Sequence, residues 1–263
     1  MKQFNATKLV FIFLSGVVLL FIIAPLISMT LATSGTQLFE TAKDQEVIDS
    51  IWLTLRVSFI TTLFFALASI PLAYLLARHD FPLKKVVTGI IDLPIVIPHS
   101  AAGIAVLGFI SRNSTIGKVA EGFGLDFVGH PVGIGLAMAY VSVPFLINAA
   151  HDGFAAVPVR LEKAALNLGA SPLRMFFTIS LPLAWRSIIS GIIMMFARGM
   201  SEFGAVIIVA YHPMITPILI YERFGAYGLK YARPVSVIFI LVCLVVFVGL
   251  RLLIKNKESA KDK

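Results

Sequence analysis

The sequence has few charged residues and few groups that could carry out chemistry. Only 14% of its 263 residues are charged, and the single cysteine, Cys243, permits no disulfide framework and no cysteine-based metal or redox motif. The only Gly-Lys pair, Gly117-Lys118, is followed by Val119 and lacks the upstream glycine of a phosphate-binding loop. The five histidines show no metal-ligand spacing. Redox catalysis, a zinc site and a nucleotide-binding loop of that type are therefore not expected.

The sequence is instead rich in long apolar runs. Apolar residues make up 58% of the chain and the mean hydropathy is +0.93, which is typical of a protein embedded in lipid. About 20 mostly apolar residues cross the hydrocarbon core as one helix. Six runs without Asp, Glu, Lys or Arg cover residues 9–39, 57–77, 93–111, 127–151, 203–221 and 234–250. The sequence therefore predicts an all-α integral membrane protein with six transmembrane helices.

The first run and the basic residues predict the orientation. Lys2 and Lys8 precede the run as in a secretory signal peptide, but residues 9–31 exceed a signal core and meet no clear cleavage site before Glu40. We therefore expect a retained helix. Fourteen Lys and Arg residues fall on the side of both termini and six on the other, so both termini are predicted to be cytoplasmic. The net charge of +8 thus suits anionic lipid and gives no reason to expect nucleic acid.

No linker divides the chain, but its two ends differ from its middle. Residues 1–50 are predicted to form an N-terminal transmembrane helix and a polar outer loop. Residues 51–254 form the core of five transmembrane helices, and residues 255–263 form a basic cytoplasmic tail.

The third run carries two prolines four positions apart. Pro94 and Pro98 are followed by His99 and Ser100. Irregular backbone at membrane depth is tolerated where neighbouring helices or a water-lined path satisfy its polar groups. We expect these four residues to line a pathway. A proline-kinked helix away from any pathway is the alternative, and for His99 a hydrogen-bonded packing role.

A polar segment separates the fourth and fifth runs. Its apolar residues recur at the spacing of a short amphipathic helix, at Leu161, Ala164, Ala165 and Leu168. Gly169 suits the left-handed position at a helix end, and Ser171-Pro172 suits an N-cap followed by proline in the first turn. A second helix is expected to run to Leu181 and to break at Pro182. The sequence predicts a helix, a glycine bend and a helix on the cytoplasmic side.

This segment resembles the permease subunits of ATP-binding-cassette importers. In that family Glu-Ala-Ala, three residues, Gly, nine residues and Ile-x-Leu-Pro mark the loop that docks on the ATPase, and the positions in register here are Ala164, Ala165, Gly169, Ile179, Leu181 and Pro182. Lys163 occupies the usual Glu position and Glu162 precedes it, which leaves open whether Glu162 makes the family's acidic contact. The docking residues implied by the resemblance are Arg160, Leu161, Glu162, Ala164, Ala165, Leu168, Gly169, Ala170 and Ser171.

The resemblance also implies the partners and a fold like that of type I importers. It implies a second copy of this chain, two copies of a separate ATPase that uses ATP and Mg²⁺, and an extracytoplasmic binding protein that delivers the substrate. No cofactor is expected on this chain itself. The alternative for the loop is an amphipathic helix lying on lipid headgroups, for which its Ala-rich apolar face is a weak anchor.

Two opposite charges are predicted at the edge of the fifth span. Arg198 and Glu202 are four positions apart and can pair on one helix face, while Ser201 lies between them. A structural ion pair and a direct substrate contact remain equally open. Positive helix ends and hydroxyls such as those of Ser100 and Ser201 could guide a divalent anion.

The segment around Arg198 and Glu202 resembles one particular group of these permeases. Ala-Arg-x-x-x-Glu-Phe-Gly-Ala, at residues 197–205, is similar to permeases for tetrahedral oxyanions. Residues 210–214 and 221–223 resemble the molybdate/tungstate branch, whereas the sulfate branch shares the Glu-Phe-Gly core. The resemblance implies oxyanion import, with molybdate or tungstate favoured and sulfate as the alternative.

Two other classes of function fit the sequence less well. A secondary transporter would need its own ion-coupling residues, for which only Asp92, Arg198 and Glu202 are candidates, and it would leave the polar segment unexplained. An intramembrane serine hydrolase would need a nucleophile elbow. Ser201 lies in Gly199-x-Ser201-x-x-Gly204, which is one residue too long.

Overall fold

The computed structural model describes residues 6–259, and every regular element within them is helical. The helices are α1 (Ala6–Leu31), α2 (Gly35–Lys43), α3 (Gln45–Arg78), α4 (Lys84–Val96), α5 (His99–Ile110), α6 (Thr115–Gly122), α7 (Pro131–Ala155), α8 (Val159–Asn167), α9 (Pro172–Met175), the π-helical turn η1 (Phe176–Ser180), α10 (Leu181–Met200), α11 (Val206–Val209), α12 (Thr216–Tyr227) and α13 (Leu229–Ser259).

Five of the described helical segments are long and apolar enough to cross a membrane, namely Thr7–Leu31, Gln45–Arg78, Pro131–Ala155, Pro172–Met200 and Leu229–Leu252. The α4 and α5 helices pass the same test together, but they are bent by 113° at the short break that contains Pro98. Counted as one broken span, this pair gives six spans. The prediction of an all-α membrane protein with six spans is confirmed.

The position of the fifth span was predicted wrongly. The uncharged run 203–221 does not form one helix, because it is divided into α11 and α12 around Pro213, whose ring removes a backbone donor. The fifth span is instead Pro172–Met200, which contains Arg174, Arg186 and Arg198. Arginine near a span end extends its charge to the membrane surface, and Arg198 has an acidic partner inside the protein. A search for uncharged runs misses such a helix.

The helix that follows the glycine bend does not break at Pro182. It continues from α9 through η1 into α10, and Pro182 lies in the first turn of α10. A π-helical turn has one residue more per hydrogen-bonded loop than an α-helix. This wider turn ends at Ser180, two residues before the proline, and the helix continues past the missing N–H of Pro182.

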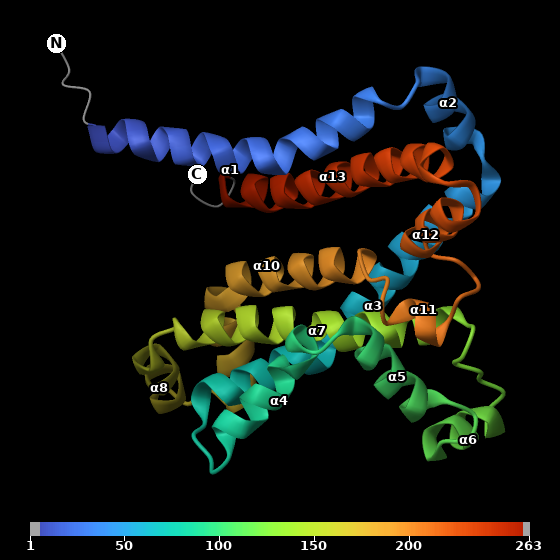
Figure 1. Ribbon diagram of the computed structural model, residues 1–263. Helices are drawn as coiled ribbons and strands as arrows, with labels where there is room; N and C mark the ends of the chain where they lie inside the picture. Colours follow the sequence, from blue (N-terminus) through green and yellow to red (C-terminus); the bar gives the residue numbers. More distant parts are fainter. Residues whose placement is uncertain (1–5, 260–263) are drawn as a thin grey trace.

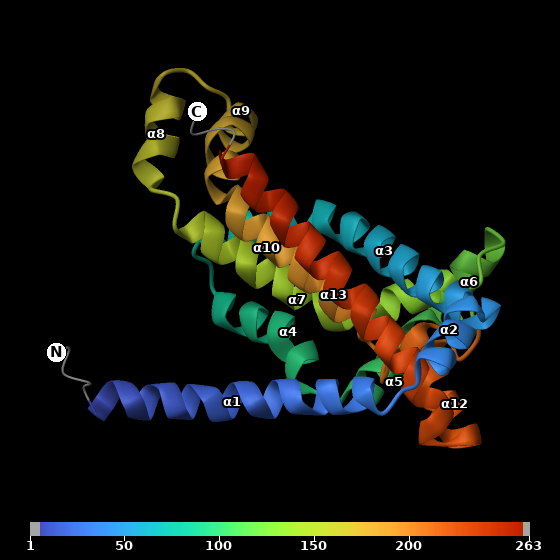
Figure 2. The ribbon, with the colours of Figure 1, turned by 90° about the horizontal axis from the view of Figure 1, so that it is seen from above.

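The packed core forms around α7. This helix contacts α3, α10, α4 and α5, and the buried side chains of one apolar cluster include Ile134 and Met138, while those of another include Phe154 and Ile188. Figure 1 shows α7 running between α10 and α4. The start of α1, the end of α13 and α8 all lie toward the same side, at the left of Figures 1 and 2. The described chain ends therefore lie on the side of the bundle that carries α8.

The first helix has little contact with this core. Among the side chains of α1 that the structure describes, only Met29 is partly buried, and Figure 2 shows α1 diverging from the other spans toward its beginning. The next long helix, α3, begins at Gln45 and continues past residue 50. The basic tail predicted at 255–263 starts as a continuation of α13, and its residues 260–263 lie outside the described residues.

Candidate functional site

The α8–α9 loop, which we define as residues 159–175, has the predicted helix, bend and helix. The first helix is Val159–Asn167, and Gly169 has φ of +86°, a left-handed conformation that glycine adopts without steric cost. The hydroxyl of Ser171 accepts a hydrogen bond from the backbone N–H of Arg174 at 3.3 Å, and Pro172 occupies the first turn of α9. The predicted bend and cap are confirmed.

Most of this loop is accessible. Exposed residues among the predicted docking set are Arg160, Leu161, Ala164, Leu168, Gly169 and Ser171, whereas Ala165 and Ala170 are partly buried. The side chain of Leu168 is 89% exposed. The apolar positions thus face outward instead of packing on the protein's own core. A small apolar surface on a loop is the kind of surface that a partner covers.

Glu162 is the exception, because it is buried within the protein. Only 5% of it is exposed, and Nε of Arg78 donates to both of its carboxylate oxygens at 3.0 and 2.8 Å. A second guanidinium nitrogen, Nη2, donates to Oε1 at 2.9 Å, and the hydroxyl of Ser180 donates to the same oxygen at 2.6 Å. Its carboxylate is therefore occupied by partners from the same chain. The sequence had left the partner of Glu162 open.

The contacts of Glu162 and of its partner Arg78 join α8 to α3, to η1 and to the chain just after α7. Arg78 is the last residue of α3, Ser180 ends η1, and Nη2 of Arg78 also donates to the carbonyl of Val157, just after α7, at 3.0 Å. Charge-assisted, two-point contacts of this kind restrict orientation as well as distance. The orientation of α8 is thereby tied to α3 and η1, and through Arg78 to the chain just after α7. Nothing in the spacing of Arg78 and Glu162, 84 residues apart, could have revealed this contact.

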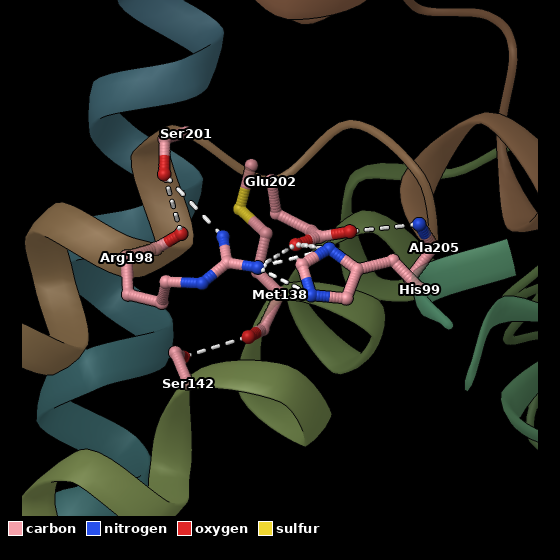
Figure 3. A network of polar contacts seen from close by, with 7 residues as sticks. All are labelled: His99, Met138, Ser142, Arg198, Ser201, Glu202 and Ala205. Carbon is pink, nitrogen blue, oxygen red and sulfur yellow. Dashed lines mark hydrogen bonds and ion pairs between the residues drawn. The ribbon is translucent and has the colours of Figure 1, made fainter. Parts of the chain in front are cut away.

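A second polar site lies inside the bundle, and we call it the His99 cluster: His99, Arg198 and Glu202 (Figure 3). Nη2 of Arg198 is 2.8 Å from Oε2 of Glu202 and 2.9 Å from both ring nitrogens of His99. Nδ1 of His99 is 3.1 Å from the same carboxylate oxygen, while the other oxygen accepts from the N–H of Ala205 at 2.8 Å. The predicted pairing of Arg198 with Glu202 is confirmed.

The burial of the His99 cluster is graded. The side chain of Glu202 is completely buried, that of Arg198 is 22% exposed and that of His99 is 38% exposed. The partly accessible guanidinium of Arg198 is thus paired with the fully buried carboxylate of Glu202. Such an arrangement holds the guanidinium in place and also neutralises most of its charge, so it offers an anion a weak contact and not a deep site.

Close backbone packing brings His99 to the other two residues. A Cβ atom at Gly204 would lie 2.7 Å from the Cβ of His99, closer than side chains pack. The first turn of α5 therefore rests directly on the chain that follows α10. Sequence reasoning placed His99 and Glu202 on a common pathway without joining them. The one sequence feature that could have indicated their contact is Gly204, because a glycine permits another part of the backbone to approach closely.

The other predicted pathway residues are less closely connected. Ser201 is exposed, and its hydroxyl donates to the carbonyl of Arg198 at 3.1 Å and accepts from Nη1 of Arg198 at 3.4 Å. Pro98 and Ser100 are exposed at the bend, whereas Pro94 is buried in α4 before it. No three His, Cys, Asp or Glu side chains among the described residues converge where a metal ion could bind.

One further polar contact inside the bundle was not foreseen. The side-chain amide of Asn148 in α7 donates to Oδ1 of Asp92 in α4 at 2.7 Å, and both residues are partly buried. The contact gives the acidic group of α4 a neutral donor on the central helix. Asp92 was considered only as an ion-coupling candidate, and this hydrogen bond gives it a packing role.

Comparison with known proteins agrees with this architecture. Residues 69–258 match the model of a family described as binding-protein-dependent transport system inner membrane component. A molybdate/tungstate transport system permease protein of Methanocaldococcus jannaschii is 41% identical over 252 residues, covering 96% of this chain and 97% of the relative. One of the same name from Pyrococcus abyssi is 46% identical over 222 residues, covering 84% of each chain.

The fold is also found among solved structures. A chain of a bacterial ABC transporter that imports the acidic polysaccharide alginate superposes with a TM-score of 0.74, at 19% identity and 95% coverage of both chains. At this identity the likeness concerns the fold alone. With the family match over most of its length and with its helices arranged in multiple spans, the chain belongs to the family of binding-protein-dependent transport system inner membrane components.

Proposed function

We propose that this chain is the permease subunit of an ATP-driven importer for molybdate or tungstate. Two copies would enclose the translocation path, two copies of a separate ATPase would dock on the α8–α9 loops, and a separate extracytoplasmic protein would deliver the anion. ATP hydrolysis belongs to the ATPase, because this chain lacks a phosphate-binding loop. The substrate follows from relatives of that name with identity above 40% along most of the chain.

The observation that carries the proposal is the accessible α8–α9 loop at the end of a membrane span. The loop leads directly into Pro172–Met200, so a force applied to α8 acts on a helix that crosses the membrane. The side that carries α8 would be cytoplasmic, where ATP is available, and both chain ends would then be cytoplasmic as well. This orientation also agrees with the excess of Lys and Arg on that side.

The His99 cluster suits a pathway that an anion passes without being retained. Its arginine, Arg198, is only partly accessible and is already paired with Glu202. Because tight binding inside a carrier slows release, selectivity would rest mainly on the separate binding protein. We therefore expect this chain to contribute transient contacts to the oxyanion and not a high-affinity site.

The test is uptake by the complex reconstituted in liposomes with its ATPase and binding protein. We expect ATP-dependent accumulation of labelled molybdate and tungstate, and little accumulation of labelled sulfate at the same concentration. Sustained uptake by this chain alone would contradict the role of permease subunit. If the complex accumulates sulfate in preference to molybdate and tungstate, the chain is still a permease subunit but the proposed substrate is wrong.

Orientation is tested separately by labelling. In a Cys243→Ser background, a cysteine introduced at exposed Ser171 should react with a membrane-impermeant maleimide only from the cytoplasmic side. Labelling from the outside of intact cells would reverse the proposed orientation and remove the ATPase from this loop.

A further inference from the structure

The outward face of the α8–α9 loop carries positive charge only. Glu162 is the one acidic residue in the segment, and its carboxylate is taken up by Arg78 and Ser180. The remaining charged side chains, those of Arg160, Lys163 and Arg174, are all exposed. Among the described residues none of these three has a side-chain ion pair or hydrogen bond, in contrast to Lys84, which pairs with Asp80 nearby.

The rotation of α8 decides which residues a partner meets. Glu162 fixes the inward side, and residues two positions away along a helix point roughly to the opposite side. Arg160 and Ala164 therefore lie on the outward side, with Lys163 beside them and Leu168 completing an exposed apolar edge. The accessible surface thus combines a small residue, which permits close approach, with unpaired cations around it.

We propose that the groove of the ATPase that receives α8 is acidic, with carboxylates opposite Arg160, Lys163 and Arg174. This inference rests on the proposed function and specifies the charge of the partner surface. Cations that lose water at an interface need opposite charges to offset the loss, and complementary charge also speeds association. Lys163 stands where the docking motif usually has Glu, so the sign of the contact at that position is reversed in this protein.

An anionic membrane surface would also attract cations, but α8 is poorly suited to it. Helices that lie in the membrane interface carry Trp, Phe or Leu along a broad apolar face. The sequence of α8 has no aromatic residue, its two leucines, Leu161 and Leu166, are each 40% exposed, and the middle of its outward side is the small residue Ala164, so no broad apolar face is present. Figure 2 shows α8 standing off beyond the ends of α7 and α10. A soluble partner with a matching groove accounts better for this position.

The test measures binding of the purified ATPase to the full-length chain in nanodiscs, at low and at high salt. For the wild type, affinity should fall as salt rises, because charge pairs are screened. Lys163→Glu, which makes the motif more typical of the family, should weaken binding by about tenfold at low salt. Reversal of all three cations should weaken it further. Lys85→Glu, at an exposed and unpaired position at the start of α4, should leave the affinity unchanged.

A matching change in the partner provides the sharpest readout. Reversal of one groove carboxylate of the ATPase to Lys should restore much of the affinity of Lys163→Glu and should weaken binding of the wild type. Because all three side chains are exposed, the variants should show the thermal unfolding and gel-filtration profile of the wild type. A variant that unfolds earlier is replaced by the neutral Lys163→Gln, which should weaken binding by a smaller factor.

The outcomes separate this inference from the proposed function. If the wild type does not bind the ATPase at all, the proposed function itself fails. If the wild type binds but the charge-reversal variants bind equally well at low salt, the acidic groove is wrong and the docking role stands. The same variants are also compared in nanodiscs with and without anionic lipid, by the reactivity of a cysteine placed in α8 toward a soluble maleimide. If anionic lipid protects this cysteine in the wild type but not in the charge-reversal variants, while ATPase binding is unchanged, the cations contact the membrane surface and the inference is overturned.

Discussion

Arg78 and Glu162 form a buried, two-point ion pair between residues that are 84 positions apart in the chain. The pair joins the last residue of a membrane span to the first turn of α8. Because an ion pair with this geometry resists both separation and rotation, a displacement of α8 must also displace the end of α3 or break the pair.

The first prediction concerns this pair. Arg78→Lys keeps the charge but cannot contact both carboxylate oxygens in a fork, so α8 should be held less firmly. We expect the variant to bind the ATPase while the number of anions transported per ATP hydrolysed falls several-fold. Lys85→Arg, at an exposed position at the start of α4 and outside the α8–α9 loop, is the control and should keep the wild-type ratio. An unchanged ratio in Arg78→Lys would show that the pair has no part in coupling.

Removing one charge of the pair should affect stability as well. Glu162→Gln leaves the guanidinium of Arg78 buried without a counter-charge, which costs about 3–5 kcal/mol of unfolding free energy in typical buried pairs. The thermal unfolding midpoint should therefore fall clearly below that of Arg78→Lys. Equal midpoints would mean that water reaches the guanidinium in the folded protein.

The second prediction concerns the bend at Gly169. Proline requires φ near −65°, whereas Gly169 has φ of +86°, so Gly169→Pro should abolish ATP-driven uptake without preventing membrane insertion. Gly169→Asn should retain more uptake, since Asn tolerates the left-handed region better than other side chains. Uptake measured beside membrane-protein yield distinguishes these effects. Wild-type transport by Gly169→Pro would rule out a role for the bend.

The third prediction is that Arg198 and Glu202 act as a unit. Arg198→Gln or Glu202→Gln alone leaves one charge unbalanced next to His99, whereas the double variant removes both charges. The double variant should therefore unfold at a higher temperature than the sum of the two single losses predicts. Strictly additive losses would indicate that the two charges do not interact in the folded protein.

The fourth prediction follows from the packing at Gly204. The added methyl group of Gly204→Ala would press on the Cβ of His99, and overpacking of this kind costs about 1–3 kcal/mol. Gly108→Ala is a matched control in α5, because a Cβ there meets nothing within 4 Å. The control should be neutral or slightly stabilising in thermal unfolding. Equal effects of the two substitutions would contradict the close packing of α5 on the Glu202 turn.

The fifth prediction concerns pH at the opposite side of the bundle from α8. Burial raises the pKa of Asp44, but the hydrogen bond and charge of Arg223 outweigh it, so the pKa lies below its ordinary value of 3.8. The carboxylate therefore contributes stability above that value and loses it as pH falls through the lower folded pKa. The difference in unfolding temperature between the wild type and Arg223→Ala should be constant from neutral pH to about pH 5 and should shrink below about pH 4. A difference that vanishes near neutral pH would exclude Asp44 as its source.

Local features of this protein could be predicted where one residue determines the backbone. Gly169 at a left-handed position, Ser171 as a cap and the break beside Pro98 all follow from local geometry. The fifth span could not be found from an uncharged run, because Arg186 interrupts it in the middle and Arg198, which pairs with Glu202 in the fold, interrupts it near its end. The inward position of Glu162 was also beyond prediction, since its partner Arg78 lies in another helix, 84 positions away in the chain.

The segment Pro172–Met200 has the α8–α9 loop at one end and Arg198 in its last turn at the other. Its 29 residues form a continuous helical run through α9, η1 and α10, about 40 Å long, which is enough to cross the hydrocarbon core. A displacement of one end of this run would therefore be passed along the helix to the other end. A movement of the α8–α9 loop caused by the ATPase would then change the position of Arg198 in the His99 cluster at the same step of the transport cycle, and no other element would be needed to connect the two sites.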